Sequence, residues 1–294
     1  MDARVADGVS LSSEKSTTDR SIVRIPPVIR FAFQTASRIS PVLGGEMARQ
    51  LFFRPMRMGY RAEQRAVLAK AQHLTLEVRG HPVQAYCWGE GPTVLLMHGW
   101  GGHAGQMTEF VAPLTGAGFR VVAIDAPAHG GSAGRLSSLV HFADAMEAAT
   151  AAFGPFRAVV AHSFGAAATV QAMLRGMEIG RLVFVAPQAR ISGYWDLFRA
   201  AAGMSEKVWQ VMRARSERWL KVSYDDLHPV DHAPRMKTPL LILHGTTDRM
   251  TPFSEGEKLA AVWPGAALKP LDCGHIAILR DWRALVAATD FIKI

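Results

Sequence analysis

The sequence predicts an α/β protein whose sheet is mostly parallel and covered by helices on both faces. Two observations support this fold class. From residue 93 onward, short apolar runs alternate with helix-like segments, which is the pattern of β-α-β units. The first run, residues 93–97, is continuously apolar, as is typical of a strand buried on both faces. With 294 residues, 49% of them apolar, the chain can form one large domain or a domain with an insertion.

The individual elements follow in order from residue 73. Apolar residues alternate with polar ones over 74–78 and 83–87, and Gly80-His81-Pro82 between them predicts a hairpin. Further strands are expected at 93–97, 119–124, 158–161, 181–186, 239–244 and 267–271. Helices are expected at 107–116, 139–153, 166–177, 255–262 and 281–294.

The first 72 residues differ from this pattern. Residues 1–21 are polar and charged, and we predict a disordered tail. Residues 22–72 are predicted to form a helical extension, in which nine basic and two acidic residues give a net charge of +7. The apolar face of its first helix consists of Ile29, Phe33, Ala36 and Ile39. We favour docking of this extension on the main domain over contact with an anionic membrane or a partner.

The α/β pattern also stops after Pro187 and resumes near residue 239. The intervening residues 188–237 carry aromatic side chains in amphipathic helical segments, and we predict a helical lid. The α/β core then comprises residues 73–187 and 238–294. Because a lid must face the site, Trp195 and Trp209 are expected to bind an apolar acyl group. The alternative is that they form only the small core of the insertion.

Composition and charge argue against several classes of protein. The net charge of +8 is spread along the chain without a run of five like charges, so nucleic-acid binding is not indicated. Cys87 and Cys273 fit neither a disulfide framework nor a zinc site, and we predict no metal and no cofactor. No apolar secretory signal is expected, and no run approaches the roughly 18 apolar residues of a membrane span. We expect a cytoplasmic protein, and its oligomeric state is left open.

Ser163 lies where a predicted strand passes directly into a predicted helix. So sharp a turn tolerates only small side chains two positions before and after its apex, and Ala161 and Gly165 supply them. This A-x-S-x-G pattern is that of a nucleophile elbow, in which a strained turn exposes the serine hydroxyl above the sheet. The alternative is an ordinary strand–helix junction with Ser163 as the helix N-cap.

Other strands are followed by polar loops that belong to the same edge of the sheet, where open α/β sheets bind ligands. In their order and gaps, the loops resemble those of the α/β-hydrolase family over residues 73–294, at positions 98–102, 161–165, 245–248 and 274–275. Residues 125–132 resemble the family's D-x-x-G-x-G-x-S loop, with Ala128 in place of the first glycine. The resemblance implies the α/β-hydrolase fold, with a mostly parallel eight-stranded sheet, helices on both faces and a lid insertion.

The candidate catalytic triad is Ser163, His275 and Asp248. A serine hydroxyl is a poor nucleophile by itself, so it needs an adjacent base, and His275 is the candidate. A carboxylate must then hold the imidazole in the correct tautomer and stabilise its protonated form. Asp248 matches the family position for this carboxylate, whereas Asp272 and Asp231 are the alternatives.

The oxyanion of the reaction needs two backbone N–H donors. Phe164, the first residue after the serine, supplies one at a helix N-terminus, and the resemblance assigns the other to Trp100. The remaining strand-end histidines are expected to brace their loops rather than to react: His98, His129, His162 and His244.

The predicted activity is hydrolysis of a small-molecule carboxylic ester or thioester through an acyl-enzyme on Ser163. By the same resemblance, a serine at the elbow argues against the dehalogenase and epoxide-hydrolase branches, which place Asp there. Acyltransferase, carbon–carbon bond hydrolase and peptidase activities remain open. A receptor that keeps the fold without turnover is the alternative from another class, because a fold alone does not settle function.

Overall fold

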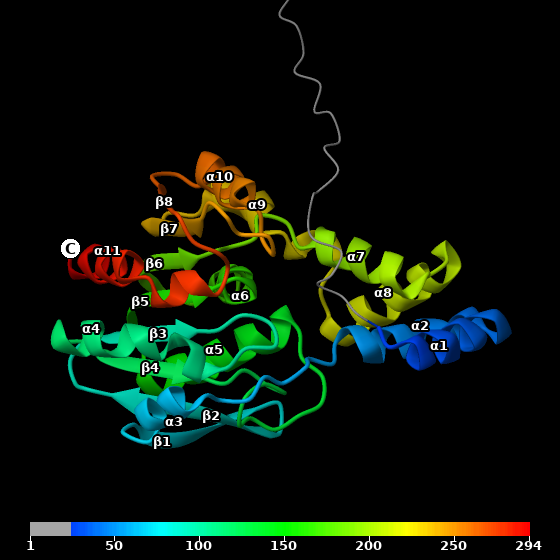
Figure 1. Cartoon of the computed structure of the whole chain (residues 1–294), viewed down its shortest axis with the longest axis horizontal. Coiled ribbons are helices and arrows are strands. Elements are labelled where there is room, and N and C mark those ends of the chain that lie inside the picture. The colour runs from blue at the N-terminus through cyan, green and yellow to red at the C-terminus, as the bar shows by residue number, and fades with distance from the viewer. Residues whose placement is uncertain (1–24) are drawn as a thin grey trace, which may run out of the picture.

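The computed structural model describes residues 25–294, so the predicted tail at 1–21 lies outside the described residues. Its centre is one eight-stranded sheet with the order β1-β2-β4-β3-β5-β6-β7-β8 (Figure 1). The first two strands are antiparallel to their neighbours, and the other six run parallel. The strands are β1 (Gln72–Val78), β2 (His81–Trp88), β3 (Thr93–Met97), β4 (Arg120–Ile124), β5 (Phe156–His162), β6 (Ile179–Val185), β7 (Leu240–Gly245) and β8 (Ala267–Leu271).

Helices cover both faces of this sheet, as predicted. One face packs against α5 (Leu139–Phe153), α6 (Phe164–Leu174) and α10 (Phe253–Val262). The other face packs against α3 (Ala62–Leu68), α4 (Val111–Gly116) and α11 (Trp282–Lys293). The predicted helix at 107–116 begins as a 3₁₀ helix, η2 (Ala104–Phe110). Every residue of the central strand β3 is buried, because both faces of the sheet are covered.

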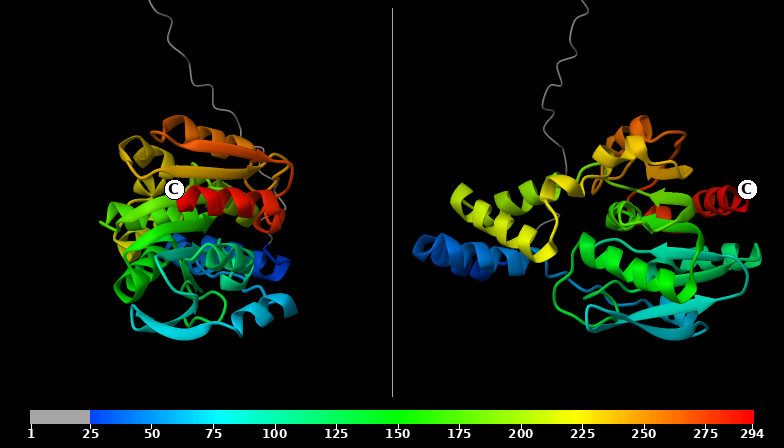
Figure 2. Two further views of the ribbon diagram at one scale, coloured as in Figure 1. Left: turned by 90° about the vertical axis from the view of Figure 1, so that its left-hand side faces the viewer. Right: turned by 180° about the vertical axis from the view of Figure 1, so that it is seen from behind.

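A second group of helices projects from one end of the sheet (Figure 2). We call α1 (Pro27–Ile39), α2 (Pro41–Phe52), α7 (Ser192–Ala202) and α8 (Glu206–Leu220) the outer helices. They come from the predicted N-terminal extension and the predicted insertion, and α2 packs along α8 while α1 packs on α2 and α7. Ser40 ends α1 and caps α2 by accepting a hydrogen bond from Val42 N–H, which accounts for the break predicted at Ser40-Pro41.

The apolar face predicted for the first helix is only partly buried. Phe33 is 2% exposed and joins the core cluster, which agrees with the predicted face. Ile39 is 74% exposed, so the prediction that Ile39 belongs to the buried face was wrong. Ile39 is the last residue of α1, directly before the break at Ser40. Among residues 25–294 no helix combines the length and apolarity that crossing a bilayer requires. Cys87 and Cys273 are free thiols.

Candidate active site

The turn between β5 and α6 holds Ser163 in a strained conformation. Its φ of 51° and ψ of −118° lie in a region that side chains other than glycine rarely adopt, at a cost of about 1–3 kcal/mol. The helix starts at the next residue, so the turn leaves no room for bulk. A Cβ atom at Gly165 would lie 2.6 Å from the carbonyl oxygen of His98. The geometry is therefore that of a nucleophile elbow rather than of an N-cap, and the Ser163 side chain makes no cap hydrogen bond.

The structure brings Ser163, His275 and Asp248 into one hydrogen-bonded row. The Ser163 hydroxyl lies 3.1 Å from Nε2 of His275, and Nδ1 of His275 lies 2.7 Å from a carboxylate oxygen of Asp248. All three residues are buried, with 6–7% of their surface exposed. The three loops that follow β5, β7 and β8 thus meet at one edge of the sheet, as their places at strand ends predict.

Asp248 is held for this contact by its own loop. Its other carboxylate oxygen accepts hydrogen bonds from the backbone N–H groups of Met250 and Thr251, each at 2.8 Å. The two alternative carboxylates lie elsewhere. Asp272 is exposed, and Asp231 pairs with Arg190 at 2.5 Å on the surface. Asp248 is therefore the carboxylate that orients His275 in this structure.

Two backbone N–H groups next to Ser163 are free to bind an anion. The Phe164 N–H is at the start of α6, and the Trp100 N–H belongs to the loop after β3. Within residues 25–294, neither has a hydrogen-bond acceptor. The loop after β3 approaches closely, because a Cβ atom at Gly99 would lie 3.1 Å from Cβ of Ser163. These two groups are the predicted oxyanion donors.

Buried neutral histidines brace the loops around the site. The Ala126 N–H donates to Nε2 of His98 at 3.0 Å, so Nδ1 of His98 carries the hydrogen that it donates to the carbonyl of Gly99. Burial lowers the pKa of both His98 and His129 to about 3. His129 donates from Nδ1 to the carbonyl of Pro127.

The other two strand-end histidines brace the triad loops. His162 donates from Nε2 to the carbonyl of His275 at 3.1 Å, and His244 donates in the same way to the carbonyl of Thr251 at 2.9 Å. Burial lowers the pKa of His162 well below its ordinary value and also lowers that of His244. Both rings thus position other groups, as the sequence predicts for them.

The loop after β4 is a structural brace. The buried carboxylate of Asp125 accepts hydrogen bonds from the N–H groups of Ala104 and Gly131, at 2.7 and 2.8 Å, and from the Tyr60 hydroxyl. Ala128, which replaces a glycine of the family pattern, has a φ of 64°. An alanine is thus held in the left-handed conformation that glycine adopts without strain.

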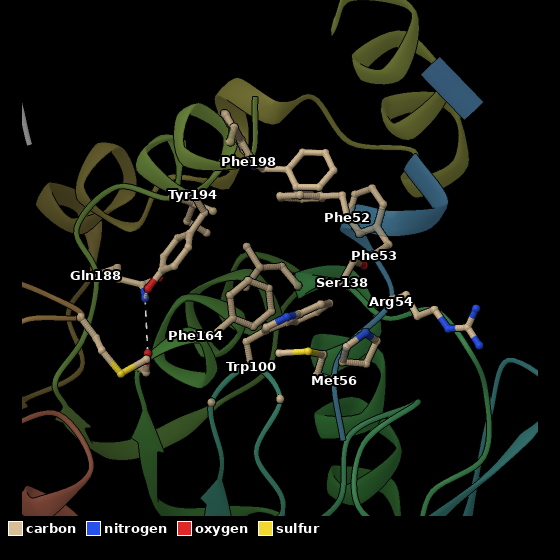
Figure 3. Close-up of a pocket in the computed structure, with 18 of the residues that line it drawn as sticks. Phe52, Phe53, Arg54, Met56, Trp100, Ser138, Phe164, Gln188, Tyr194 and Phe198 are labelled. Carbon is tan, nitrogen blue, oxygen red and sulfur yellow. Dashed lines mark hydrogen bonds between the residues drawn. The ribbon is translucent and has the colours of Figure 1, made fainter. Parts of the chain in front are cut away.

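A cavity of about 610 Å³ opens from Ser163 toward the outer helices. Figure 3 shows Gln188 and Tyr194 at one end, Trp100 and Phe164 in the middle, and aromatic rings at the other end. Most of the lining is apolar, as is usual for pockets that bind small molecules.

The two tryptophans predicted to bind substrate have different positions. Trp195 lines the cavity and stacks on Tyr224, with ring centroids 4.4 Å apart. Trp209 does not line it; its ring lies behind those of Trp195 and Tyr224, at 6.4 and 5.9 Å. The prediction for Trp209 is thus corrected, because helix α8 directs this side chain into the packing between the insertion helices.

Two groups of cavity-lining residues were not predicted from the sequence. Gln188 donates from Nε2 to the Ser163 hydroxyl at 3.3 Å and to the Tyr194 hydroxyl at 2.5 Å. It follows β6, so the strand-end argument used for the other loops would have found it. The second group, from the N-terminal helices, carries no motif that marks it. Among residues 25–294 no group of three or more His, Cys, Asp or Glu side chains is arranged to hold a metal ion.

Comparison with known proteins identifies the family. The family model described as "Alpha/beta hydrolase family" matches residues 94–289, about two thirds of the chain. The chain belongs to the alpha/beta hydrolase family. A search of curated protein sequences finds no match.

Solved structures share the fold at low sequence identity. A hydrolase from Pseudomonas aeruginosa matches with a TM-score of 0.61 and 20% identity, covering 76% of this chain and 98% of its own. An esterase from Pyrococcus furiosus matches with a TM-score of 0.61 and 18% identity, covering 81% and 98%. An esterase from Exiguobacterium antarcticum matches with a TM-score of 0.60 and 14% identity, covering 76% and 100%. At such identities the likeness concerns the fold.

Proposed function

We propose that this α/β hydrolase cleaves a carboxylic ester or thioester through an acyl-enzyme on Ser163. The observation that carries the proposal is the row of hydrogen bonds from Ser163 through His275 to Asp248, at 3.1 and 2.7 Å, at the mouth of an apolar cavity. A strained serine, an adjacent imidazole and an orienting carboxylate are the parts that nucleophilic acyl transfer requires.

In the acylation step, Nε2 of His275 takes the Ser163 proton while Oγ bonds to the substrate carbonyl carbon. The carbonyl oxygen becomes an oxyanion, which the N–H groups of Trp100 and Phe164 stabilise. His275 then gives its proton to the departing alcohol or thiol, and the carbon–oxygen or carbon–sulfur bond breaks. A water molecule, deprotonated by His275, releases the acid and restores Ser163. Throughout, Asp248 stabilises the imidazolium.

The cavity supports an apolar acyl group as the part of the substrate that is bound. Most of its lining is apolar, and burial of apolar surface is the main favourable term in such binding. We further propose that the insertion at 188–237 acts as a lid, because Ile191, Tyr194 and Trp195 at its start line the cavity. Proteins of this fold described as esterases and as a thioesterase domain are consistent with either leaving group.

The test of this function is labelling with a fluorophosphonate, combined with hydrolysis of p-nitrophenyl esters. We expect the wild-type protein to be labelled and Ser163→Ala to be unlabelled, with kcat reduced by a factor on the order of 10⁴ or more and with the fold intact. Full labelling of Ser163→Ala would remove Ser163 as the nucleophile. Labelling of the wild type without turnover of any ester or thioester would favour a receptor that keeps the triad.

A further inference from the structure

Part of the cavity wall comes from outside both the hydrolase core and the insertion. The N-terminal segment contributes two stretches to the lining, residues 25–29 with gaps and residues 51–58 with one gap. We propose that α1, α2 and the residues that follow them form the distal wall of an acyl-binding site for a long aliphatic chain, and that this wall limits the chain length. The proposal rests on the hydrolase function proposed above.

The distal end of the cavity is a cluster of aromatic rings from two separate segments. Phe52, at the end of α2, lies 5.0 Å from the Phe53 ring and 5.1 Å from the ring of Phe198 on α7. The Phe53 ring in turn lies 5.1 Å from that of Trp219 on α8. Figure 3 shows Phe52, Phe53 and Phe198 together at the end of the cavity opposite Gln188. A chain that extends from the nucleophile therefore meets rings from the N-terminal segment.

Close helix packing keeps this wall in place. A Cβ atom at Gly45 on α2 would lie 2.5 Å from Cγ1 of Val211 and 3.0 Å from the backbone nitrogen of Met212, so only glycine lets α2 approach α8 this closely. A polar contact also holds α2 against α8, because the Glu46 carboxylate accepts a hydrogen bond from Nε of Arg215 on α8 at 2.8 Å. The Glu46 pKa is lowered to about 2, mainly by its hydrogen bonds with Arg49.

Backbone hydrogen bonds then connect the wall to the loops of the site. The Ser137 N–H donates to the carbonyl of Phe53 at 2.8 Å, and the Met58 N–H donates to the carbonyl of Gly101 at 3.4 Å. Gly101 belongs to the loop that carries the proposed oxyanion donor Trp100. The N-terminal segment is thus attached to the loop after β3 and to the residues just before α5, and its side chains have defined positions relative to Ser163.

The chemistry of the lining selects an aliphatic chain. Gln188 and Tyr194 contact each other near the nucleophile, whereas the phenyl rings of Phe52, Phe53 and Phe198 meet at the distal end. Each methylene group that leaves water for such a wall contributes about fourfold to binding. A substitution that narrows the distal end should therefore lower kcat/KM for esters of long acids and leave kcat/KM for esters of short acids nearly unchanged.

The experiment uses a pair of neighbouring residues on α1. Ile29 lines the cavity, while Val28 is 79% exposed, so Ile29→Trp adds bulk to the wall that the N-terminal segment contributes and Val28→Trp is the matched control. We expect Ile29→Trp to lower kcat/KM for p-nitrophenyl decanoate at least tenfold while p-nitrophenyl acetate changes less than twofold, since an indole excludes two or more methylenes. Val28→Trp should leave both values unchanged. An unchanged decanoate-to-acetate ratio in a folded Ile29→Trp protein would overturn the proposal.

Two further measurements separate this inference from the proposed function. The binding of parinaric acid, a fluorescent fatty acid, to Ser163→Ala requires no turnover, and Ile29→Trp in that background should weaken it at least tenfold. Equal binding by the two proteins would refute the distal wall even if esterase activity exists. Decyl acetate carries the long chain in its alcohol part, whereas p-nitrophenyl decanoate carries it in its acyl part. If Ile29→Trp lowers kcat/KM for decyl acetate and not for p-nitrophenyl decanoate, the cavity binds the alcohol chain and the acyl assignment is wrong.

Discussion

The two ends of the cavity are built by different means. At the Ser163 end, hydrogen bonds between strand-end loops position each polar group, as when His162 holds the carbonyl of His275 at 3.1 Å. At the distal end, aromatic rings from the outer helices meet through van der Waals contact, without hydrogen bonds between their side chains. Polar bonds are directional and apolar packing is not. The first end therefore suits a reaction of fixed geometry, and the second suits substrates that differ in length.

The largest expected effect concerns the polar end. Ser163→Ala and His275→Ala should each lower kcat by a factor on the order of 10⁴ or more, and the double change should cost less than tenfold beyond either one. The reason is that triad members act as a unit, so losing one removes most of the benefit of the others. Steady-state kinetics with p-nitrophenyl acetate measures this.

If the loss of kcat in the double variant equals the product of the losses in Ser163→Ala and His275→Ala, the two residues do not share a role. His81→Ala serves as the control, because His81 is an exposed residue at the start of β2 that does not line the cavity. We expect its kcat to match that of the wild-type protein.

The second effect contrasts two tryptophans of the insertion. Trp195→Ala removes a cavity-lining ring and should lower the decanoate-to-acetate ratio of kcat/KM about tenfold, equivalent to about two methylenes of lost contact. Trp209→Ala removes a ring buried behind it, so it should lower the free energy of unfolding by about 3–5 kcal/mol and leave the ratio unchanged. Ester kinetics and urea denaturation of both variants make the comparison.

A changed ratio in Trp209→Ala, with the Trp195→Ala ratio equal to that of the wild type, would reverse the two assignments. If neither variant alters the ratio while kcat stays normal, the insertion is a structural cover and the proposed lid role fails.

The third effect is a pH dependence of stability at the polar end. Burial keeps the pKa of His98 and His129 near 3, whereas an unfolded histidine titrates near 6.5. Below pH 6.5 the unfolded chain therefore binds protons that the folded protein does not bind, and stability falls as the pH falls toward 3. At pH 5 the loss is on the order of 2 kcal/mol per histidine.

Urea denaturation at pH 7 and pH 5 measures this loss. His129→Phe, whose ring can pack beside Phe142 as the imidazole does, should reduce the difference between the two pH values by about 2 kcal/mol. The exposed His81→Gln should leave the difference as it is in the wild-type protein. If His129→Phe shows the wild-type difference, His129 does not contribute to the acid sensitivity.

Much of the polar end was predictable because its constraints are local. Ala161 and Gly165 flank Ser163 in the chain, and the turn between a strand and a helix demands small residues at those positions. The apolar runs at 93–97 and 158–161 predict buried strands, and residues that follow parallel strands lie at one edge of the sheet. Gln188 follows the same rule and was missed because no residue pattern accompanies it.

By itself, the sequence determined the α/β-hydrolase fold and the loops that bring Ser163, Asp248 and His275 to one edge. Strand and helix periodicity and small-residue turns act between neighbours in the chain, so they can be read without coordinates. Only the tertiary structure decided which side chains form the distal wall. Glu46 and Arg215 are 169 positions apart, and their contact follows from how closely α2 packs on α8. Such packing depends on the shapes of both surfaces together, which neither segment encodes alone.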